Sequence, residues 1–390
     1  MFPAEILRRR VAFFTVSRLA FNTSIRMVYP FLAFFAASLN TDVAAISLAL
    51  AVSMTTSALG PFIAPIADRR GRKVGMLIGM GFFLLGTLLV SFFPGYFTFF
   101  LVIMLGNLGN NIFLPAMQAY LGDHTEYQKR GFYMAITELS WALSFILLVP
   151  LAGLLMAKTN WYTPYIVLSA LDALIIAVLW SLIPADHPLE TSPLTVLADI
   201  RKVLSYPPAA ISILMGTLFI IGNELVSVVY GVWMNATFGL QVTALGIASI
   251  VIGVAELSGE GLTAWLADRL GKQRTIGLSL VTNSLWVLAL PWLGRSTIGA
   301  FIWLFVFYLT FETAIVSNLP LISEITPATR ATMISLFTAA LSLGRAIGDL
   351  AAPALFRGGF IVNAAVCAAL DLLALIALSR IKLPESSRDR

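Results

Sequence analysis

The stretch Gly60–Lys73, GPFIAPIADRRGRK, decides how this chain is organised. An apolar segment leads into one acid, four bases and a glycine, in a chain that is otherwise poor in charge. A shorter copy, ADRLGK, returns 200 positions later at Ala267–Lys272. In each copy the aspartate can cap a helix start or accept from an arginine, and the glycine permits a turn that is costly for other residues. Two copies half a chain apart favour an internal duplication over an ordinary charged loop.

The composition is that of a membrane protein. Of the 390 residues, 59% are hydrophobic and 12% are charged, whereas about 25% are charged in soluble domains. The net charge of +5 lies in loop clusters, so we expect no nucleic-acid partner. Cys367 is the only cysteine, and the two histidines, His124 and His187, lie near polar loops. We therefore expect no disulfide framework, no metal centre and no cofactor.

Apolar stretches predict an all-α membrane protein. Each is close to the ~20 residues needed to cross hydrocarbon, and they predict twelve transmembrane helices at 11–38, 44–66, 74–93, 97–121, 131–156, 162–183, 209–235, 243–267, 274–294, 297–322, 331–355 and 359–380. The first is too long for a signal peptide. Of the 25 Lys and Arg residues, 19 fall on one side of these spans, 3 on the other and 3 inside them. The positive-inside rule then predicts that both termini are cytoplasmic. We expect a multi-pass integral protein of a bacterial inner (plasma) membrane.

A polar, proline-containing segment divides the chain. We expect an N-terminal six-helix bundle at 1–183, a cytoplasmic linker at 184–208 and a C-terminal six-helix bundle at 209–390. Residues 194–204 can form a short helix along the membrane surface. Four matches at an offset of 200 support two parallel repeats: Asp68 with Asp268, Arg69 with Arg269, Gly71 with Gly271, and Arg130 with Arg330.

Gly60–Lys73 resembles the loop signature between helices two and three of the major facilitator superfamily of secondary transporters, and residues 264–274 resemble its degenerate second copy. Leu121–Asp123, followed by Arg130, resembles the superfamily's second cytoplasmic signature. The resemblance implies two pseudo-symmetric bundles around a midplane cavity. It also implies a cytoplasmic gate, in which Asp123 forms an ion pair with Arg72 and Asp68 caps the start of the eleventh span. A purely structural role for these residues would use the same bonds. The predicted gate residues are Asp68, Arg69, Gly71, Arg72, Asp123, Arg130, Asp268, Arg269, Gly271 and Arg330.

Charges inside the membrane cost about 2.5–3.5 kcal/mol each on insertion scales, so each needs a reason. Arg26 must face a wet cavity or a carboxylate, and we expect an ion pair with Glu138. Pro30 should bend the first span, and Tyr29 can line the same cavity as Arg26. Amides in the fourth span can either bridge helices or contact a ligand.

The second half carries more intramembrane acids than the first. Residues 222–225, GNEL, followed by Tyr230, resemble the seventh helix of twelve-span drug/proton antiporters, which implies that Glu224 carries the proton. Glu224 has no base in its own helix, so we expect it to be protonated. Its rivals are Glu312 and the pair Glu256 and Glu260, which share one helix face. The predicted substrate and proton cavity comprises Arg26, Tyr29, Asn107, Asn110, Asn111, Glu138, Trp141, Glu224, Tyr230, Glu256, Glu260 and Glu312.

These features predict a secondary active transporter that moves a small, amphipathic or cationic molecule by alternating access, with proton-coupled efflux as the first hypothesis. Its expected partners are the substrate, protons and the lipid bilayer, and we expect a monomer. Proton-coupled uptake, flipping of a lipid-like substrate and a non-transporting sensor remain open alternatives. ATP-driven transport is disfavoured because no phosphate-binding loop motif is present. An intramembrane enzyme is disfavoured because no nucleophile–base dyad falls in a span.

Overall fold

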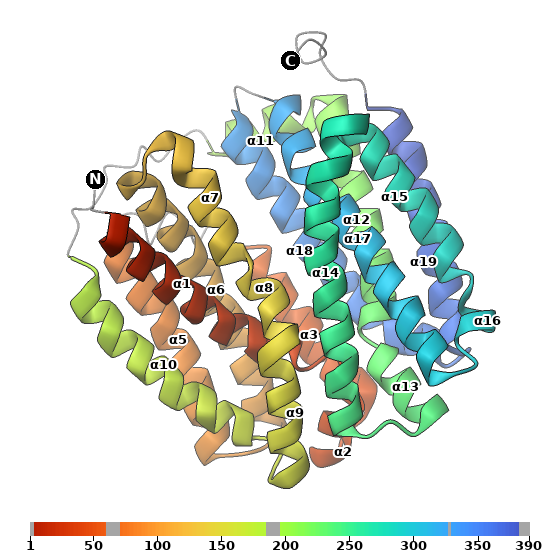
Figure 1. Cartoon of the computed structure of the whole chain (residues 1–390), viewed down its shortest axis with the longest axis horizontal. Helices are drawn as coiled ribbons and strands as arrows, with labels where there is room; N and C mark the ends of the chain where they lie inside the picture. The colour runs from red at the N-terminus through yellow and green to blue at the C-terminus, as the bar shows by residue number, and fades with distance from the viewer. Residues whose placement is uncertain (1–3, 60–70, 185–195, 327–328, 382–390) are drawn as a thin grey trace. The chain divides into compact units, whose positions relative to one another are not determined.

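The computed structural model describes residues 4–59, 71–184, 196–326 and 329–381. Regular structure in these ranges is helical (Figure 1). The chain divides into two compact units. Unit 1 comprises Met1–Thr191 together with Leu240–Gly253, and unit 2 comprises Ser192–Gly239 together with Val254–Arg390. The predicted linker at 184–208 lies partly outside the described residues, and the predicted surface helix within it is observed as α11 (Val196–Leu204).

Unit 1 is a helical bundle in which α5 lies along α6 (Figure 1). The two helices approach closely because glycines face each other, and a Cβ added to Gly79 would lie 2.6 Å from the carbonyl oxygen of Gly109. Phe21 of α1 packs on Phe83 and Phe113, with ring centroids 4.7 and 5.4 Å apart. The elements are α1 (Ala4–Arg26), α2 (Leu32–Ser38), α3 (Val43–Ser57), α5 (Arg72–Phe92), α6 (Tyr96–His124), α7 (Tyr127–Glu138), α8 (Ser140–Leu143), the π-helical turn η1 (Ser144–Leu148), α9 (Val149–Lys158) and α10 (Thr163–Leu182).

Unit 2 is a second bundle, in which α12 packs against α18 and α19, and α15 packs against α17 and α19. Its core includes Phe219 stacked on Phe311 with centroids 4.8 Å apart. After α11, the elements are α12 (Pro207–Ser227), α13 (Tyr230–Phe238), α14 (Val242–Leu270), α15 (Lys272–Val287), α16 (Leu290–Leu293), α17 (Thr297–Ile325), α18 (Arg330–Phe356) and α19 (Phe360–Ser379). The first residues of α14 belong to unit 1.

Nine helical segments within the described ranges are long and apolar enough to cross a membrane. Leu32–Ser38 and Val43–Ser57 meet the same criterion together but are bent by 112°. Every predicted span nevertheless contains a helix. The first falls short of the criterion because α1 carries five arginines, and the ninth because α15 has only 16 residues. The predicted bend at Pro30 is a break, because α1 ends at Arg26 and α2 begins at Leu32.

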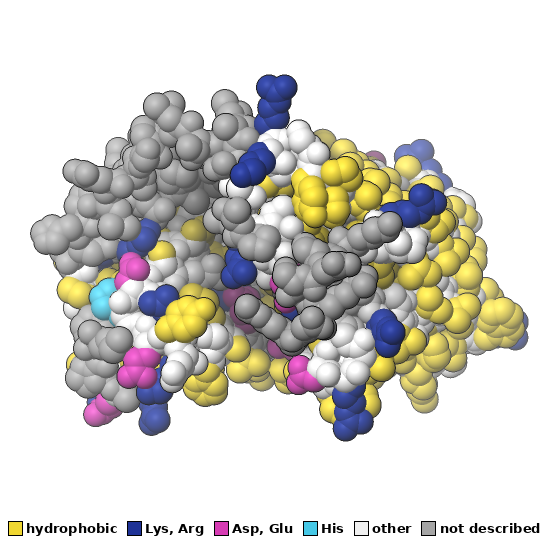
Figure 2. All heavy atoms as spheres, turned by 90° about the horizontal axis from the view of Figure 1, so that it is seen from above, with side chains coloured by type: hydrophobic (Ala, Val, Ile, Leu, Met, Phe, Trp, Pro, Cys, Tyr) yellow, Lys and Arg dark blue, Asp and Glu magenta, His cyan; other side chains and the backbone are white. Residues whose placement is uncertain are grey.

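Large apolar side chains cover the outer faces of the helices. Leu174 is 61% exposed and Ile376 is 57% exposed. Contiguous apolar surface of this kind is unfavourable in water and is what hydrocarbon requires. In Figure 2, Lys and Arg side chains lie across the face turned to the viewer, while hydrophobic side chains cover the flank at the right. The distribution fits helices that cross a bilayer and end in charged loops.

Candidate functional site

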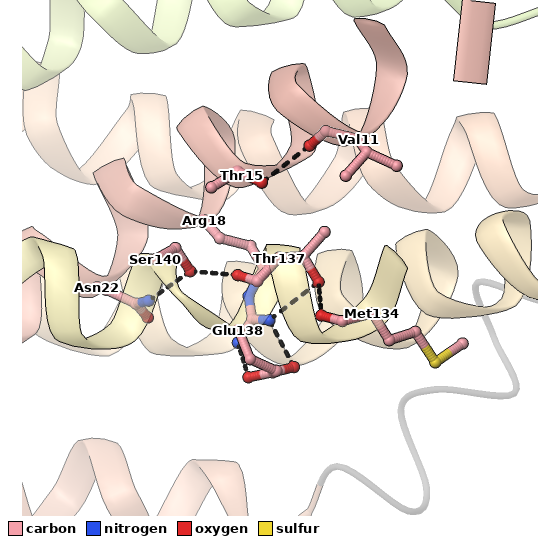
Figure 3. Close-up of polar contacts among 8 residues, drawn as sticks. All are labelled: Val11, Thr15, Arg18, Asn22, Met134, Thr137, Glu138 and Ser140. Atoms are coloured by element: carbon pink, nitrogen blue, oxygen red, sulfur yellow. Dashed lines mark hydrogen bonds and ion pairs between the residues drawn. The ribbon is translucent and has the colours of Figure 1, made fainter. Parts of the chain in front are cut away.

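An ion pair that the sequence did not predict joins α1 to α7 in unit 1 (Figure 3). Arg18 Nη1 lies 2.5 Å from Glu138 Oε1, and Arg18 Nη2 donates to Glu138 Oε2 at 2.7 Å. Two parallel bonds of this kind fix the geometry as well as the charge. The Arg18 side chain is 6% exposed, whereas that of Glu138 is 45% exposed. The pair is therefore asymmetric, with a buried base and a carboxylate that retains an open edge.

A chain of hydroxyl and amide bonds surrounds this pair. Asn22 Nδ2 donates to Ser140 Oγ at 3.2 Å, and Ser140 Oγ donates to the carbonyl oxygen of Thr137 at 2.7 Å. The Thr137 hydroxyl accepts from Arg18 Nη1 at 3.4 Å. Arg18 and Asn22 are four residues apart and so share one face of α1. This polar face of α1 is therefore satisfied by α7 and α8, as buried polar groups require.

The prediction that Arg26 pairs with Glu138 was wrong. Arg26 Nη1 donates to the carbonyl oxygen of Trp141 at 2.6 Å. Its guanidinium carbon lies 4.1 Å from the ring centroid of Trp141 and 3.6 Å from that of Phe145. Arg26 stands eight residues, or roughly 12 Å along the helix, beyond Arg18. Glu138 lies at the level of Arg18, so a different base meets the acid.

A local irregularity in the fifth span accompanies this contact. Pro150 has no N–H, and its ring would clash with the carbonyl oxygen of residue 146 in a regular helix. The backbone widens instead into η1, where the Val149 N–H donates to the Ser144 carbonyl oxygen five residues back. Turns of this type are frequent at functional sites. Here the widened turn begins three residues after Trp141, whose carbonyl oxygen accepts from both Arg26 and the Ser144 hydroxyl.

The amides of the fourth span have different environments. Asn107 Nδ2 donates to the carbonyl oxygen of Ser53 at 3.1 Å and to its hydroxyl at 3.2 Å, so this amide bridges α6 and α3. Asn111 Nδ2 is buried and has no hydrogen-bond partner among the described residues. Asn110 is half-buried. Tyr29 is buried in the turn between α1 and α2. Bridging is thus observed for one of the three predicted amides.

Unit 2 contains a buried three-charge cluster on α12 and α18. Arg345 Nη1 forms an ion pair with Glu224 Oε1, and the Glu224 side chain is fully buried while that of Arg345 is 24% exposed. Asp349, one turn after Arg345, is fully buried and interacts electrostatically with both. Neither carboxylate oxygen of Asp349 has a hydrogen-bond partner in the described part of the chain. One guanidinium therefore faces two acids, and Glu224 has a basic neighbour that its own helix did not reveal.

Glycines on α18 make this cluster possible. A Cβ added to Gly348 would collide with Glu224 Cβ and lie 3.2 Å from the carbonyl oxygen of Ile221. A Cβ added to Gly344, one turn earlier, would lie 3.2 Å from the carbonyl oxygen of Thr217. Small residues four apart let membrane helices approach closely. Gly348 thus fixes how near Glu224 stands to the charges on α18.

The other predicted acids and aromatic residues lie on neighbouring helices of unit 2. Glu256 and Glu312 are buried, and Glu260 is half-buried. A Cβ added to Gly259 of α14 would lie 2.7 Å from Glu312 Cβ, so α14 and α17 are in close contact. The ring centroid of buried Tyr230 lies 6.5 Å from that of Tyr308 on α17.

The duplicated loop has the predicted glycine geometry in both copies. Gly71 and Gly271 have φ values of 93° and 81°, in the left-handed region that favours glycine, and each immediately precedes a helix. The predicted contact of Arg72 with Asp123 is present, with Nε 3.5 Å from Oδ2. An equivalent pair in unit 2 joins Lys272, the residue after Gly271, to Glu324.

The remaining predicted gate residues make other contacts. Arg130 Nε donates to the Thr125 carbonyl oxygen at 3.1 Å, and Arg330 Nε donates to the Ser323 carbonyl oxygen at 3.0 Å. Each arginine thus bonds to the end of the preceding long helix. Asp268 and Arg269 lie in the last turn of α14 rather than at a helix start, and the Arg269 guanidinium carbon lies 4.3 Å from the Trp265 ring centroid. Asp68 and Arg69 lie outside the described residues.

Apolar helices of spanning length, with buried charges among them, define a multi-pass membrane protein. The family model of the Major Facilitator Superfamily matches residues 14–221 and 212–390. The chain therefore belongs to this superfamily, whose members are transporters and not enzymes.

Three relatives illustrate the range of similarity. The uncharacterized MFS-type transporter YceJ of Bacillus subtilis (strain 168) is 29% identical over 77% of this chain and 77% of its own length. The chromaffin granule amine transporter of Rattus norvegicus is 26% identical over 60% of this chain and 44% of its own length. Multidrug resistance protein 2 of Bacillus subtilis is 25% identical over 61% of each. The crystal structure of the nucleoside transporter NupG shares the fold, with a TM-score of 0.78 and 14% identity over 96% of this chain and 99% of NupG.

Proposed function

We propose that this protein is a proton-coupled secondary transporter that exports a small cationic or amphipathic molecule. The observation that carries the proposal is the cluster of Glu224, Arg345 and Asp349. With both acids ionised, the cluster has a net charge of −1 inside the membrane. A buried charge without a partner costs several kcal/mol, so the second acid favours binding of a cation. That cation is a proton in one half of the cycle and the substrate in the other.

Charge balance explains why the two cations would exchange. One proton or one monovalent organic cation brings the cluster to neutrality, and both together would make it positive. Each therefore displaces the other, and a pH gradient across the membrane can drive the substrate outward. The names of the amine transporter and the multidrug resistance protein support a cationic substrate and export, respectively.

Unit 1 contributes less directly to this mechanism. The rings of Trp141 and Phe145 are suited to cation binding, but Arg26 already occupies their faces. Arg18 likewise bonds both oxygens of Glu138. We therefore place the exchanged cation at the cluster in unit 2. Glu138, with its open edge, is the acid of unit 1 that can contact a substrate.

We also propose the arrangement that the basic residues predict: a monomer in a bacterial inner membrane with both termini cytoplasmic. The bacterial relatives support this setting. The loop at 60–73, with Arg72 held by Asp123, would act as the cytoplasmic gate of alternating access.

The test is transport in proteoliposomes with a panel of fluorescent and radiolabelled organic cations, with and without an imposed pH gradient. We expect gradient-driven flux in the wild type. Glu224→Gln and Asp349→Asn each leave the cluster neutral, so each should lose the response to the gradient and most of the exchange of the cationic substrate. Asp371→Asn is the matched control, because Asp371 is also a buried acid of unit 2 but lies on α19 beside Cys367.

Three outcomes would overturn the proposal. The first is a wild-type response to the gradient in both cluster variants, and the second is an equal loss in Asp371→Asn. The third is movement of the substrate in the same direction as the protons when the pH gradient is imposed, which would establish uptake. Flux of none of the panel, together with lipid movement between leaflets, would favour flipping of a lipid-like substrate.

A further inference from the structure

A cavity of about 340 Å³ lies in unit 1 where η1 and α9 pack beside α10. Its walls include Leu151, Leu154 and Leu155 on one side and Leu168 and Leu171 on the other. Thr23 of α1 also lines it. The volume falls at the lower end of the ≈300–1,000 Å³ typical of small-molecule sites. The cavity is separate from the charged residues of the transport proposal.

The cavity is suited to a hydrocarbon chain. Its walls are aliphatic, and the Thr23 hydroxyl already donates to the Leu19 carbonyl oxygen at 2.6 Å. The cavity opens at the outer surface of the helices, because Leu151 is 52% and Val167 is 50% exposed. In a membrane-spanning bundle that surface faces lipid, so a lipid chain can enter from the side.

One lysine gives the cavity a charged end. Lys158 is the last residue of α9, is exposed and lines the cavity. Among the described residues no carboxylate lies within 4 Å of its ammonium group. From Leu148 to Lys158 the helical rise is roughly 15 Å, which equals half of the ≈30 Å hydrocarbon thickness. The cavity therefore has the length of one leaflet, with a positive charge where a lipid phosphate would lie.

We propose that this cavity binds one acyl chain of an anionic phospholipid, with the phosphate held by Lys158. Lys158 lies between the predicted spans 131–156 and 162–183, in a loop that the positive-inside rule places on the side opposite the cytoplasm, so the lipid would belong to that leaflet. The lipid would pack against Thr23 of α1 and would support the helix that carries the buried arginines Arg10, Arg18 and Arg26. This inference does not rest on the proposed transport activity.

Native mass spectrometry of the purified, delipidated full chain tests the proposal. Phosphatidylglycerol and phosphatidylcholine with identical acyl chains are added separately, and the tightest-bound lipid is measured. A single basic group near a charged headgroup contributes enough to make phosphatidylglycerol binding about fivefold tighter in the wild type. Lys158→Gln should abolish that preference and keep the weaker binding. Leu151→Trp, which fills an exposed part of the wall, should weaken binding of both lipids severalfold.

Matched controls separate this site from general lipid adhesion. Leu174→Trp places the same bulk on α10 at a position that is 61% exposed and does not line the cavity. Lys129→Gln removes an exposed lysine that is paired with Glu126 at 2.7 Å. Both controls should bind as the wild type does. A retained preference in Lys158→Gln, or an equal loss in Leu151→Trp and Leu174→Trp, would overturn the assignment.

Discussion

Removing one partner of the Arg18–Glu138 pair should lower the free energy of unfolding far more when the charge that remains is the buried one. Glu138→Gln leaves the guanidinium of Arg18, 6% exposed, without its counter-ion. Loss of a buried partner costs on the order of 3 kcal/mol. Arg18→Met instead leaves Glu138, which is 45% exposed and can take up water, so its loss should cost only about 1 kcal/mol, as for exposed pairs.

Thermal unfolding followed by tryptophan fluorescence measures this asymmetry. A change of 1 kcal/mol shifts Tm by roughly 2–4 °C in a unit of about 200 residues. Glu138→Gln should therefore lower Tm by roughly 6–12 °C and Arg18→Met by roughly 2–4 °C. The double variant Arg18→Met/Glu138→Gln should recover much of the loss, because no buried charge remains. Equal shifts in the two single variants, or additive shifts in the double, would refute the reasoning.

Three further predictions concern the close contacts and the loops. Gly348→Ala should destabilise the protein by about 1–3 kcal/mol and disturb the Glu224 ion pair, because the added Cβ would meet the backbone and Glu224 Cβ. Gly261→Ala is the control, because a Cβ there has nothing within 4 Å, and it should leave Tm unchanged or raise it. Equal Tm values for the two variants would contradict the packing argument. Arg72→Asp should impair flux, and the charge-swapped double variant with Asp123→Arg should restore part of it; flux equally low in the double would argue against a direct pair. Asp68→Asn should slow transport without changing Tm, and full flux in this variant would remove its gating role.

The sequence predicted the fold well because the deciding signals are local. Three signals can be recognised without knowing which helices are in contact. They are the length of the apolar stretches, the concentration of bases in alternate loops, and the two glycine turns at matching positions. Gly71 and Gly271 have the positive φ values that the loop pattern predicts. The break after Arg26 was predicted only as a bend, because Pro30 signals an irregularity but not its extent.

The partners of the buried charges could not be predicted, because they depend on how helices are rotated against each other. Arg18 is one of the three bases that fall inside the predicted spans, and the sequence indicates no partner for it, yet it is the residue that contacts Glu138, 120 positions away. Glu224 has no base on its own helix, and its partner Arg345 lies 121 positions further along the chain. One signal was present: Gly344 and Gly348, four apart beside an intramembrane arginine, mark the face of α18 that approaches another helix.

Arg130 and Arg330 use a different kind of acceptor from the ion pairs Arg72–Asp123 and Lys272–Glu324. Each donates to a main-chain carbonyl oxygen, of Thr125 and Ser323 respectively, and not to a side chain. Every residue type supplies that acceptor, so substitution at Thr125 or Ser323 need not weaken it. By contrast, the side-chain pairs beside the two glycine turns already differ in composition between the halves. After a duplication, a bond to the backbone survives as long as the arginine is kept, whatever residue supplies the carbonyl oxygen. If these loops were exchanged between the two halves of this chain, the arginine–backbone bond should therefore be retained.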